Sequence, residues 1–448
     1  MERLSLDALR RLDAAHLIHP FTDSAQLHRD GTRIIRAGSG CTVIDETGRE
    51  LLDGLAGLWC VNVGYGRREI ADAVQRQMLE LAYYPSFFDT TTEPAILLAA
   101  KLAELAPPGL RRVFFGNSGS DANETALKLV RAYQKLRGTP RKTKIVTRSF
   151  AYHGVTLATS SMTGLPACTD PFDLPLPGFV QVPGPYAYGA GRESEAEEYA
   201  AACLRETERI FEREDPATIA AMFVEPVQGA GGVIVPPPGH LSALRDLCRR
   251  HDVLFVADEV ITAFGRMGDW FASSLWRLAP DLIVTAKGLT SGYLPLAATI
   301  VSDGVADVLA AGGVLSHGYT YTAHPTPCAA ALANLAILER EQLPARVRDD
   351  IGPYFQAGLR ELAPHRAVGE VRGVGLMGAL DLVPREGRSA LTATTLLGLR
   401  AARLVREQGA IVRPIRNLIA LAPPLIIERS EIDRLLAAVA RALDRLWD

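Results

Sequence analysis

The fold is decided by two apolar runs, Leu254-Phe255-Val256-Ala257-Asp258 and Leu282-Ile283-Val284-Thr285-Ala286-Lys287. Both are short, rich in β-branched residues and without polar alternation, which is typical of strands buried on both faces of a parallel sheet. In such sheets ligands bind just beyond the carboxyl ends of the strands. Asp258 and Lys287 occupy such ends and lie 29 residues apart, the length of one strand and its crossover. The sequence therefore predicts an α/β fold with an acid and a primary amine at one edge of its sheet.

An acid and a primary amine at neighbouring strand ends suit the chemistry of pyridoxal phosphate. The lysine can form a Schiff base with the aldehyde of this cofactor, and the acid can keep its pyridine nitrogen protonated. Each residue also has a purely structural interpretation, Asp258 as the N-cap of the next element and Lys287 as a solvated charge beside Gly288. The choice between these interpretations depends on the other segments.

Length and composition are those of an ordinary globular chain. The 448 residues allow two or three domains, and the hydrophobic (48%) and charged (22%) fractions are unremarkable. A formal net charge of −3 provides no basic field for nucleic acid or anionic lipid. Residues 1–7 are mixed in charge, unlike a signal peptide, and no apolar run approaches the roughly 20 residues that span a bilayer. Six scattered cysteines without C-x-x-C spacing predict buried thiols. We therefore expect a cytoplasmic protein with neither nucleic-acid nor membrane partners.

A candidate anion site follows the apolar run Val113-Phe114-Phe115. The turn Gly116-Asn117-Ser118-Gly119-Ser120 leads into a helix predicted over residues 121–136. The free amides and positive dipole end of a helix start bind phosphate, and two serines and two glycines around one turn favour that interpretation. Ser118 and Asp121 also fit a simple capping box. No G-K-[ST] follows, so the turn is not a Walker A loop.

Other segments carry weaker signals. The aromatic cluster Tyr83-Tyr84-Pro85-Ser86-Phe87-Phe88 suits a core and a pocket wall about equally, and residues 164–191 predict a long surface excursion. After residue 340 the pattern changes to α+β. There Gly373-Val374-Gly375-Leu376-Met377-Gly378 matches G-x-G-x-x-G, but an extended segment follows instead of a helix, so the dinucleotide interpretation is rejected. No spacing typical of metal ligands occurs, and no metal site is predicted.

Eight segments spread over nearly the whole chain form one ordered set: His19-Pro20-Phe21-Thr22, Gly57-Leu58-Trp59-Cys60-Val61-Asn62-Val63-Gly64-Tyr65-Gly66-Arg67, Asn117-Ser118-Gly119-Ser120, Tyr152-His153-Gly154, Glu225-Pro226-Val227-Gln228-Gly229-Ala230-Gly231-Gly232, Ala257-Asp258-Glu259-Val260, Ala286-Lys287-Gly288-Leu289 and Ala422-Pro423-Pro424-Leu425. In this order they resemble the class III (ω-amino acid:pyruvate type) aminotransferases of the fold-type-I pyridoxal phosphate family. The resemblance implies a large cofactor-binding domain, residues 61–329, with a mostly parallel seven-stranded sheet between helices. Residues 1–60 and 330–448 would form a smaller α+β domain from both chain termini.

The resemblance also assigns a role to each matched residue. Lys287 would carry the cofactor as an internal aldimine, and Asp258 would hold the pyridine nitrogen. The other cofactor contacts would come from Ser118, Gly119, Ser120, Tyr152, His153, Glu225, Val260 and Thr320, the last from the neighbouring subunit. The substrate pocket would be lined by Phe21, Trp59, Phe87, Phe88, Tyr152, Ala230 and Arg413.

Two arginines compete for the substrate carboxylate. Arg413 matches the mobile arginine of the family, and it is the preferred assignment. Arg416 lies three residues further on, where relatives usually carry a small or polar residue. Residues 160–191 match relatives poorly and would shape the substrate pocket, so the sequence does not identify the amine donor.

The implied activity is a ping-pong transamination from a primary amine or ω-amino acid to a keto acid, with pyruvate as the expected acceptor. The role of Thr320 implies a homodimer with shared active sites, and a tetramer is the alternative. The same scaffold also serves aminomutases and decarboxylating aminotransferases, which stay open as alternatives. A non-catalytic or NAD-dependent α/β protein is a further alternative that rests on residues 373–378 alone.

Overall fold

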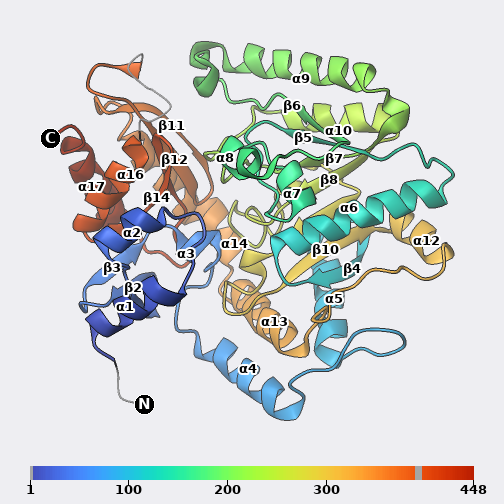
Figure 1. Ribbon diagram of the computed structural model, residues 1–448, viewed down its shortest axis with the longest axis horizontal. Helices are drawn as coiled ribbons and strands as arrows, with labels where there is room; N and C mark the ends of the chain where they lie inside the picture. Colours follow the sequence, from blue (N-terminus) through green and yellow to red (C-terminus); the bar gives the residue numbers. More distant parts are fainter. Residues whose placement is uncertain (1–3, 389–395) are drawn as a thin grey trace.

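A computed structural model describes residues 4–388 and 396–448 (Figure 1). Its centre is a seven-stranded sheet in the order β4 (Leu110–Gly116), β10 (Ala297–Ser302), β9 (Leu282–Thr285), β8 (Leu254–Asp258), β7 (Ile219–Val224), β5 (Lys144–Arg148) and β6 (Phe179–Val182). β10 runs antiparallel to both of its neighbours, and the other adjacent strands pair in parallel. The expected α/β fold with a mostly parallel seven-stranded sheet is therefore confirmed.

Helices cover both faces of this sheet, because its central strands are apolar on both sides. Met222 and Phe223 are successive residues of β7 that belong to opposite packing layers, as the two-residue period of a strand requires. β7, β8 and β9 are buried along their whole length, which confirms the two strands predicted at 254–258 and 282–285. The covering helices are α6 (Gly119–Leu136) and α12 (Asp303–Ala311) on the Phe223 side, and α9 (Ala196–Arg213) and α10 (His240–Arg250) on the Met222 side.

Three further helices pack together beside the antiparallel end of the sheet (Figure 1). The long helix α13 (Pro325–Arg340) contacts both α4 (Arg68–Glu80) and α5 (Glu93–Leu105), and α5 also packs on β4.

The two ends of the chain meet in a smaller α+β part. The N-terminal strands β1 (Ile35–Ser39), β2 (Thr42–Asp45) and β3 (Glu50–Asp53) are extended by β13 (Ala410–Ile411), which pairs in parallel with β3. A second, antiparallel sheet has the order β11 (Val368–Val374), β12 (Met377–Leu382), β15 (Leu418–Leu421) and β14 (Arg413–Ile415), with α15 (Gly352–Arg360), α16 (Leu397–Glu407) and α17 (Arg429–Asp444) packed beside it. This arrangement confirms a smaller part built from both termini.

Residues 164–191 and 373–378 are the two segments whose structure the sequence indicated least clearly. Residues 164–191 were expected to form a surface excursion, but they contain α8 (Pro166–Thr169) and β6, the edge strand beside β5. A strand of four residues between Pro- and Gly-rich segments carries too little periodicity to be found from sequence. The G-x-G-x-x-G match at 373–378 spans the β11–β12 hairpin, where a Cβ on Gly373 would lie 2.3 Å from the Met377 carbonyl oxygen. Close strand packing therefore explains its glycines.

The remaining α-helices are α1 (Leu6–His16), α2 (Ser24–Asp30), α3 (Ala56–Trp59), α7 (Leu157–Ser161), α11 (Ala272–Leu275) and α14 (Leu343–Arg346). Within residues 4–388 and 396–448, no helix has the length and apolar character needed to cross a bilayer. The same residues hold no group of three or more His, Cys, Asp or Glu side chains arranged to bind a metal ion.

Candidate active site

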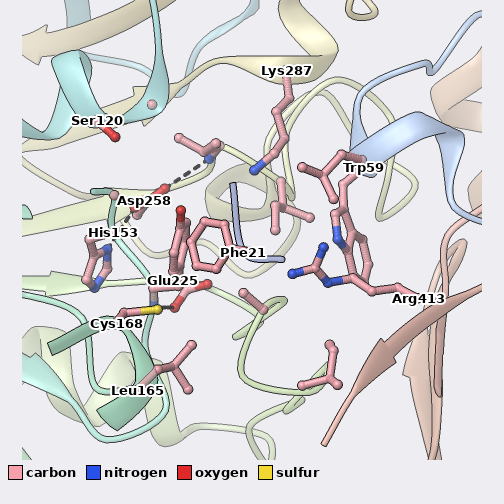
Figure 2. A pocket seen from close by; sticks show the side chains of 18 of the residues that line it. Phe21, Trp59, Ser120, His153, Leu165, Cys168, Glu225, Asp258, Lys287 and Arg413 are labelled. Atoms are coloured by element: carbon pink, nitrogen blue, oxygen red, sulfur yellow. Dashed lines mark hydrogen bonds and ion pairs between the residues drawn. The ribbon is translucent and has the colours of Figure 1, made fainter. Parts of the chain in front are cut away.

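A cavity of about 810 Å³ collects the side chains that follow the carboxyl ends of three central strands (Figure 2). Glu225 comes directly after β7, Asp258 ends β8, and Lys287 lies two residues beyond β9. The volume falls within the range of small-molecule sites, and its position is where parallel sheets bind ligands. The acid and the lysine that were predicted to meet at this sheet edge thus line one cavity.

The Asp258 carboxylate is buried and accepts three hydrogen bonds. Oδ2 accepts from Asn123 Nδ2 and from His153 Nδ1, each at 2.8 Å, and Oδ1 accepts from the Val260 amide at 3.1 Å. Three converging N–H donors fix the position and orientation of this carboxylate. Asp258 therefore supplies a fixed negative charge to the cavity.

Asn123 was missed by the sequence reasoning. It lies three residues after Ser120 on α6, so both side chains belong to one face of that helix. This spacing was the available signal in the sequence. It points to the site only once the first turns of α6 are known to lie beside Asp258.

Lys287 reaches into the cavity from a strained turn. Its φ is 43°, in the left-handed region that a side-chain-bearing residue rarely adopts. A Cβ on the next residue, Gly288, would lie 2.6 Å from Asn62 Nδ2, and Asn334 Nδ2 donates to the Gly288 carbonyl at 2.9 Å. Burial lowers the pKa of the Lys287 amine from its ordinary value, although nearby acidic groups oppose that shift. Strain of this kind persists only where the surrounding contacts enforce it, and it often marks a functional position.

The start of α6 forms another wall of the cavity. Ser118 is the N-cap, and its Oγ accepts from the Asp121 amide at 3.1 Å, which confirms the capping by Ser118. The return bond of a capping box is replaced, because Asp121 Oδ2 accepts from the Asn117 amide at 3.0 Å. Gly119 and Ser120 line the cavity, and Ser120 Oγ accepts from the Val155 amide at 3.1 Å. The first amides of a helix lack partners within it, which leaves an anion-binding end open to the cavity. Capping and anion binding are thus compatible at this turn.

Glu225 and Tyr152 are joined near the cavity floor. The Glu225 carboxyl group is buried and accepts from the Tyr152 amide at 2.9 Å and the Gly229 amide at 3.3 Å. The Arg148 guanidinium donates to the Glu225 backbone carbonyl. Burial raises the pKa of Glu225 to about 7 and also raises the pKa of Tyr152. Glu225 therefore carries a proton more readily than an exposed acid.

The outer part of the cavity is apolar apart from its arginines. Trp59 is buried, and Phe21 lies at the cavity mouth with its side chain largely exposed. Figure 2 shows the Arg413 guanidinium beside Trp59 and pointing into the cavity. Burial lowers the pKa of Arg413, and its Nε atom is buried without a hydrogen-bond partner among the described residues. Ala230 and Val260 also line the cavity, as does Arg416.

Some lining residues were not singled out from the sequence. Leu165 and Cys168 come from α8 and the residue before it, within the segment expected to shape the pocket. The other lining residues without a role assigned from the sequence are Pro20, Leu58, Gly154, Pro166, Ala167, Val227, Ile261, Pro414 and Ile415. Only three-dimensional packing brings these side chains to the site.

Four residues expected at the site do not line the cavity of their own chain: Ser118, Phe87, Phe88 and Thr320. Ser118 is the N-cap of α6. Phe87 packs against Phe88, whose side chain is fully exposed, and Thr320 is exposed on a segment where its carbonyl accepts from Tyr83 Oη at 2.6 Å. Phe87 and Phe88 therefore do not form a wall of the substrate pocket within their own chain. The assignment of Thr320 to a neighbouring subunit stays a prediction.

Comparison with known proteins identifies the family. The family model "Aminotransferase class-III" matches residues 25–443. A putrescine–pyruvate aminotransferase of Pseudomonas aeruginosa is 41% identical over 434 residues, covering 97% of this chain and 95% of that protein. A diaminobutyrate–2-oxoglutarate transaminase of Halomonas elongata is 42% identical over 427 residues, covering 93% and 91%. The crystal structure of a thermostable (S)-enantioselective omega-transaminase from Thermomicrobium roseum aligns over 100% of both chains with a TM-score of 0.96 and 42% identity.

The matched length, the identity and the fold agree, and the fold is that of the fold-type-I transaminases. The chain belongs to the class III aminotransferases, which are pyridoxal-phosphate-dependent enzymes that use small-molecule amines and keto acids.

Proposed function

We propose that this aminotransferase moves the amino group of a primary amine or ω-amino acid to pyruvate, with Lys287 and Asp258 as its catalytic residues. The observation that carries the proposal is that the Lys287 amine and the Asp258 carboxylate, which is fixed by hydrogen bonds, line one cavity. Pyruvate as acceptor is supported by the similarity to the putrescine–pyruvate aminotransferase.

The residues of the cavity fit pyridoxal phosphate. Three of its polar groups would each meet a complementary partner: the aldehyde the Lys287 amine, the pyridine nitrogen the Asp258 carboxylate, and the phosphate the N-terminus of α6 at Ser120. Gly119 supports the fit further, because a Cβ there would lie 3.2 Å from both methyl carbons of Val260 and would fill the space beside the helix start. The phosphate would thus bind the Gly119 and Ser120 amides and the Ser120 hydroxyl, with Ser118 holding the turn as N-cap.

When bound, pyridoxal phosphate supplies an aldehyde for the amino group and a ring that withdraws electrons from the reacting carbon. Lys287 would bind that aldehyde. Once displaced by substrate, its amine would take a proton from the substrate carbon and return it to the cofactor side. The lowered pKa of Lys287 favours the neutral amine that this transfer requires.

Asp258 would keep a proton on the pyridine nitrogen. A unit charge about 4 Å away at an effective dielectric near 20 contributes roughly 4 kcal/mol, which corresponds to about three pKa units. The three donors to Asp258 keep its charge in place. Tyr152 and Val260 would contact the two faces of the ring, and His153 would act through Asp258.

The substrate would lie in the outer part of the cavity. Trp59, Phe21 and Ala230 form an apolar wall suited to the carbon chain of an amine. Arg413 would bind the carboxylate of the keto acid, since its guanidinium lies in the cavity and has an unpartnered Nε among the described residues.

We infer a homodimer with shared active sites. Residues near Thr320 carry an unusual set of exposed apolar side chains, and a monomeric protein rarely exposes so many in adjoining segments. The set comprises Leu79 (81% exposed), Phe88 (103%), Val314 (92%) and Tyr321 (58%). Such a surface suits a second copy of the chain, to whose cavity Phe87, Phe88 and Thr320 would then contribute. Light scattering during size exclusion should give twice the chain mass; a monomer with full activity would reject this inference.

A direct test of the reaction uses purified protein with pyridoxal phosphate, a panel of amine donors and pyruvate. Alanine should form only when donor and pyruvate are both present, and no CO₂ should be released. Borohydride treatment followed by peptide mass spectrometry should find the cofactor label at Lys287. Pyruvate-independent rearrangement of the donor, or CO₂ release in step with turnover, would instead identify an aminomutase or a decarboxylating enzyme.

A further inference from the structure

Arg416 occupies a turn position that suits glycine. It lies between β14 and β15 with a φ of 50°, in the left-handed region, and it lines the same cavity as Arg413. A long side chain in this conformation strains the backbone, whereas glycine adopts it freely. The strain is tolerated where the side chain makes a compensating contact.

The side chain of Arg416 is held by an aromatic ring. Its guanidinium lies over Phe150, 5.4 Å from the ring centroid. Stacking of this kind orients the planar group and leaves its N–H donors free at the edges. Within the part of the chain that the structure describes, neither Arg413 nor Arg416 forms an ion pair with a carboxylate.

The acids of the cavity do not neutralise these two arginines. Asp258 keeps its negative charge but is held by Asn123, His153 and the Val260 amide instead of pairing with either arginine. Glu225 accepts from two backbone amides, and its raised pKa reduces its charge. Two guanidinium groups therefore give this side of the cavity an uncompensated positive field, which favours a ligand with two negative charges.

We propose that Arg416 lets the cavity use a dicarboxylic 2-oxo acid as an acceptor besides pyruvate, by binding the distal carboxylate of that acid. Arg413 binds the carboxylate beside the keto group, so the inference rests on the role given to Arg413 above. Three residues of extended chain span about 10 Å between Cα atoms. Two long arginine side chains that line one cavity can close that separation and hold the two ends of one short diacid, each through paired N–H donors.

The test compares two acceptors with one amine donor. In the wild-type holoenzyme, kcat/KM is measured for 2-oxoglutarate and for pyruvate, and the ratio is followed in Arg416→Gln and Arg416→Lys. The ratio should fall about tenfold in Arg416→Gln and less in Arg416→Lys, which keeps the charge. The matched control is Arg366→Gln, because Arg366 also stacks on an aromatic ring, Trp447 at 4.7 Å, but does not line the cavity. That control should leave the ratio unchanged.

A binding measurement makes the test independent of turnover. Glutarate and butyrate are titrated into the holoenzyme and followed by the change in cofactor absorbance. Glutarate should bind more tightly than butyrate. In Arg416→Gln the Kd for glutarate should rise about tenfold, whereas the Kd for butyrate should change little. The glutarate preference should also decrease with salt, because Arg416 is exposed.

An unchanged acceptor ratio in Arg416→Gln, or equal binding of glutarate and butyrate by the wild type, overturns the inference. Absence of amino transfer with either acid contradicts the proposed function instead. In that case the titration still decides whether Arg416 recognises a second carboxylate.

Discussion

The Nδ1 atom of His153 lies 2.8 Å from Oδ2 of Asp258, and both side chains are buried. An ionised carboxylate only accepts hydrogen bonds, so Nδ1 must carry the proton. The Nε2 atom of His153 is buried and has no partner among the described residues. Among the described residues the imidazole thus makes its side-chain hydrogen bond to Asp258, and through it His153 can orient the carboxylate.

We expect His153→Leu to reduce kcat about 10- to 100-fold with a smaller change in KM, because a hydrogen bond to a charged group contributes about 1.5–3 kcal/mol. His153 would be a positioning residue, so the pH at which the bound cofactor changes its absorbance should shift as well. His240→Leu serves as the control, since His240 is also buried but does not line the cavity. An unchanged absorbance titration in His153→Leu would limit this residue to packing.

Asp258→Asn keeps the shape of the side chain and removes its charge. We expect the variant to retain pyridoxal phosphate but to lose about 1,000-fold in kcat, which corresponds to the roughly 4 kcal/mol estimated for a charge at this position. Cofactor content is measured by absorbance and turnover by alanine formation. Turnover within a few-fold of the wild type would contradict the assignment of Asp258 to the pyridine nitrogen.

Sequence reasoning reached the parts of this site that sit at regular positions of the fold. Asp258 and Lys287 were predictable because each follows a short run buried on both faces, and the carboxyl ends of parallel strands converge. Gly119 and Ser120 were predictable because a strand, a small-residue turn and a helix start define an anion site locally.

The remainder depends on contacts between distant segments. Cys168 reaches the cavity because the connection between β5 and β6 folds back over the strand ends. Phe88 matches a pocket residue of the family in sequence, yet its side chain points away from the cavity of its own chain. A motif identifies such a residue but does not determine where its side chain lies in the folded chain.

Arg413→Ala should raise the KM for pyruvate strongly and spare uncharged amines. Removing one partner of a desolvated charge pair costs about 2–5 kcal/mol, or roughly 30- to several-thousand-fold in kcat/KM. The measurement compares kcat/KM for the acid and for an amine without a carboxylate in the same variant. Equal losses for both substrates would show that Arg413 supports the cavity rather than binding the carboxylate.

The raised pKa of Glu225 predicts a pH-dependent stability of the cofactor-free protein. The group's ordinary pKa is 4.5 and its pKa in the folded chain is about 7. Between these values the folded state binds more protons than the unfolded state, so stability falls as pH rises from about 4.5 to 7. The loss amounts to about 3 kcal/mol for a buried group with this shift. Urea unfolding at several pH values should show it, and Glu225→Gln should flatten that part of the profile; an unaltered slope would assign the dependence to other groups.

Gly154→Ala should weaken cofactor binding through Ser120. A Cβ at residue 154 would lie 2.7 Å from Ser120 Oγ and 2.5 Å from Thr159 Oγ1, at a φ of 138° that disfavours any side chain. Ser120 would have to move away from the start of α6, and we expect the Kd for pyridoxal phosphate to rise about tenfold, a loss of about 1.4 kcal/mol. Gly304→Ala in α12 is the control, because open space surrounds that position. Fluorescence titration gives the Kd for pyridoxal phosphate. Thermal unfolding without cofactor shows whether the substitution also destabilises the fold. If Gly154→Ala lowered Tm while leaving the Kd unchanged, Ser120 would not be a phosphate ligand, because its displacement would leave cofactor affinity unaffected.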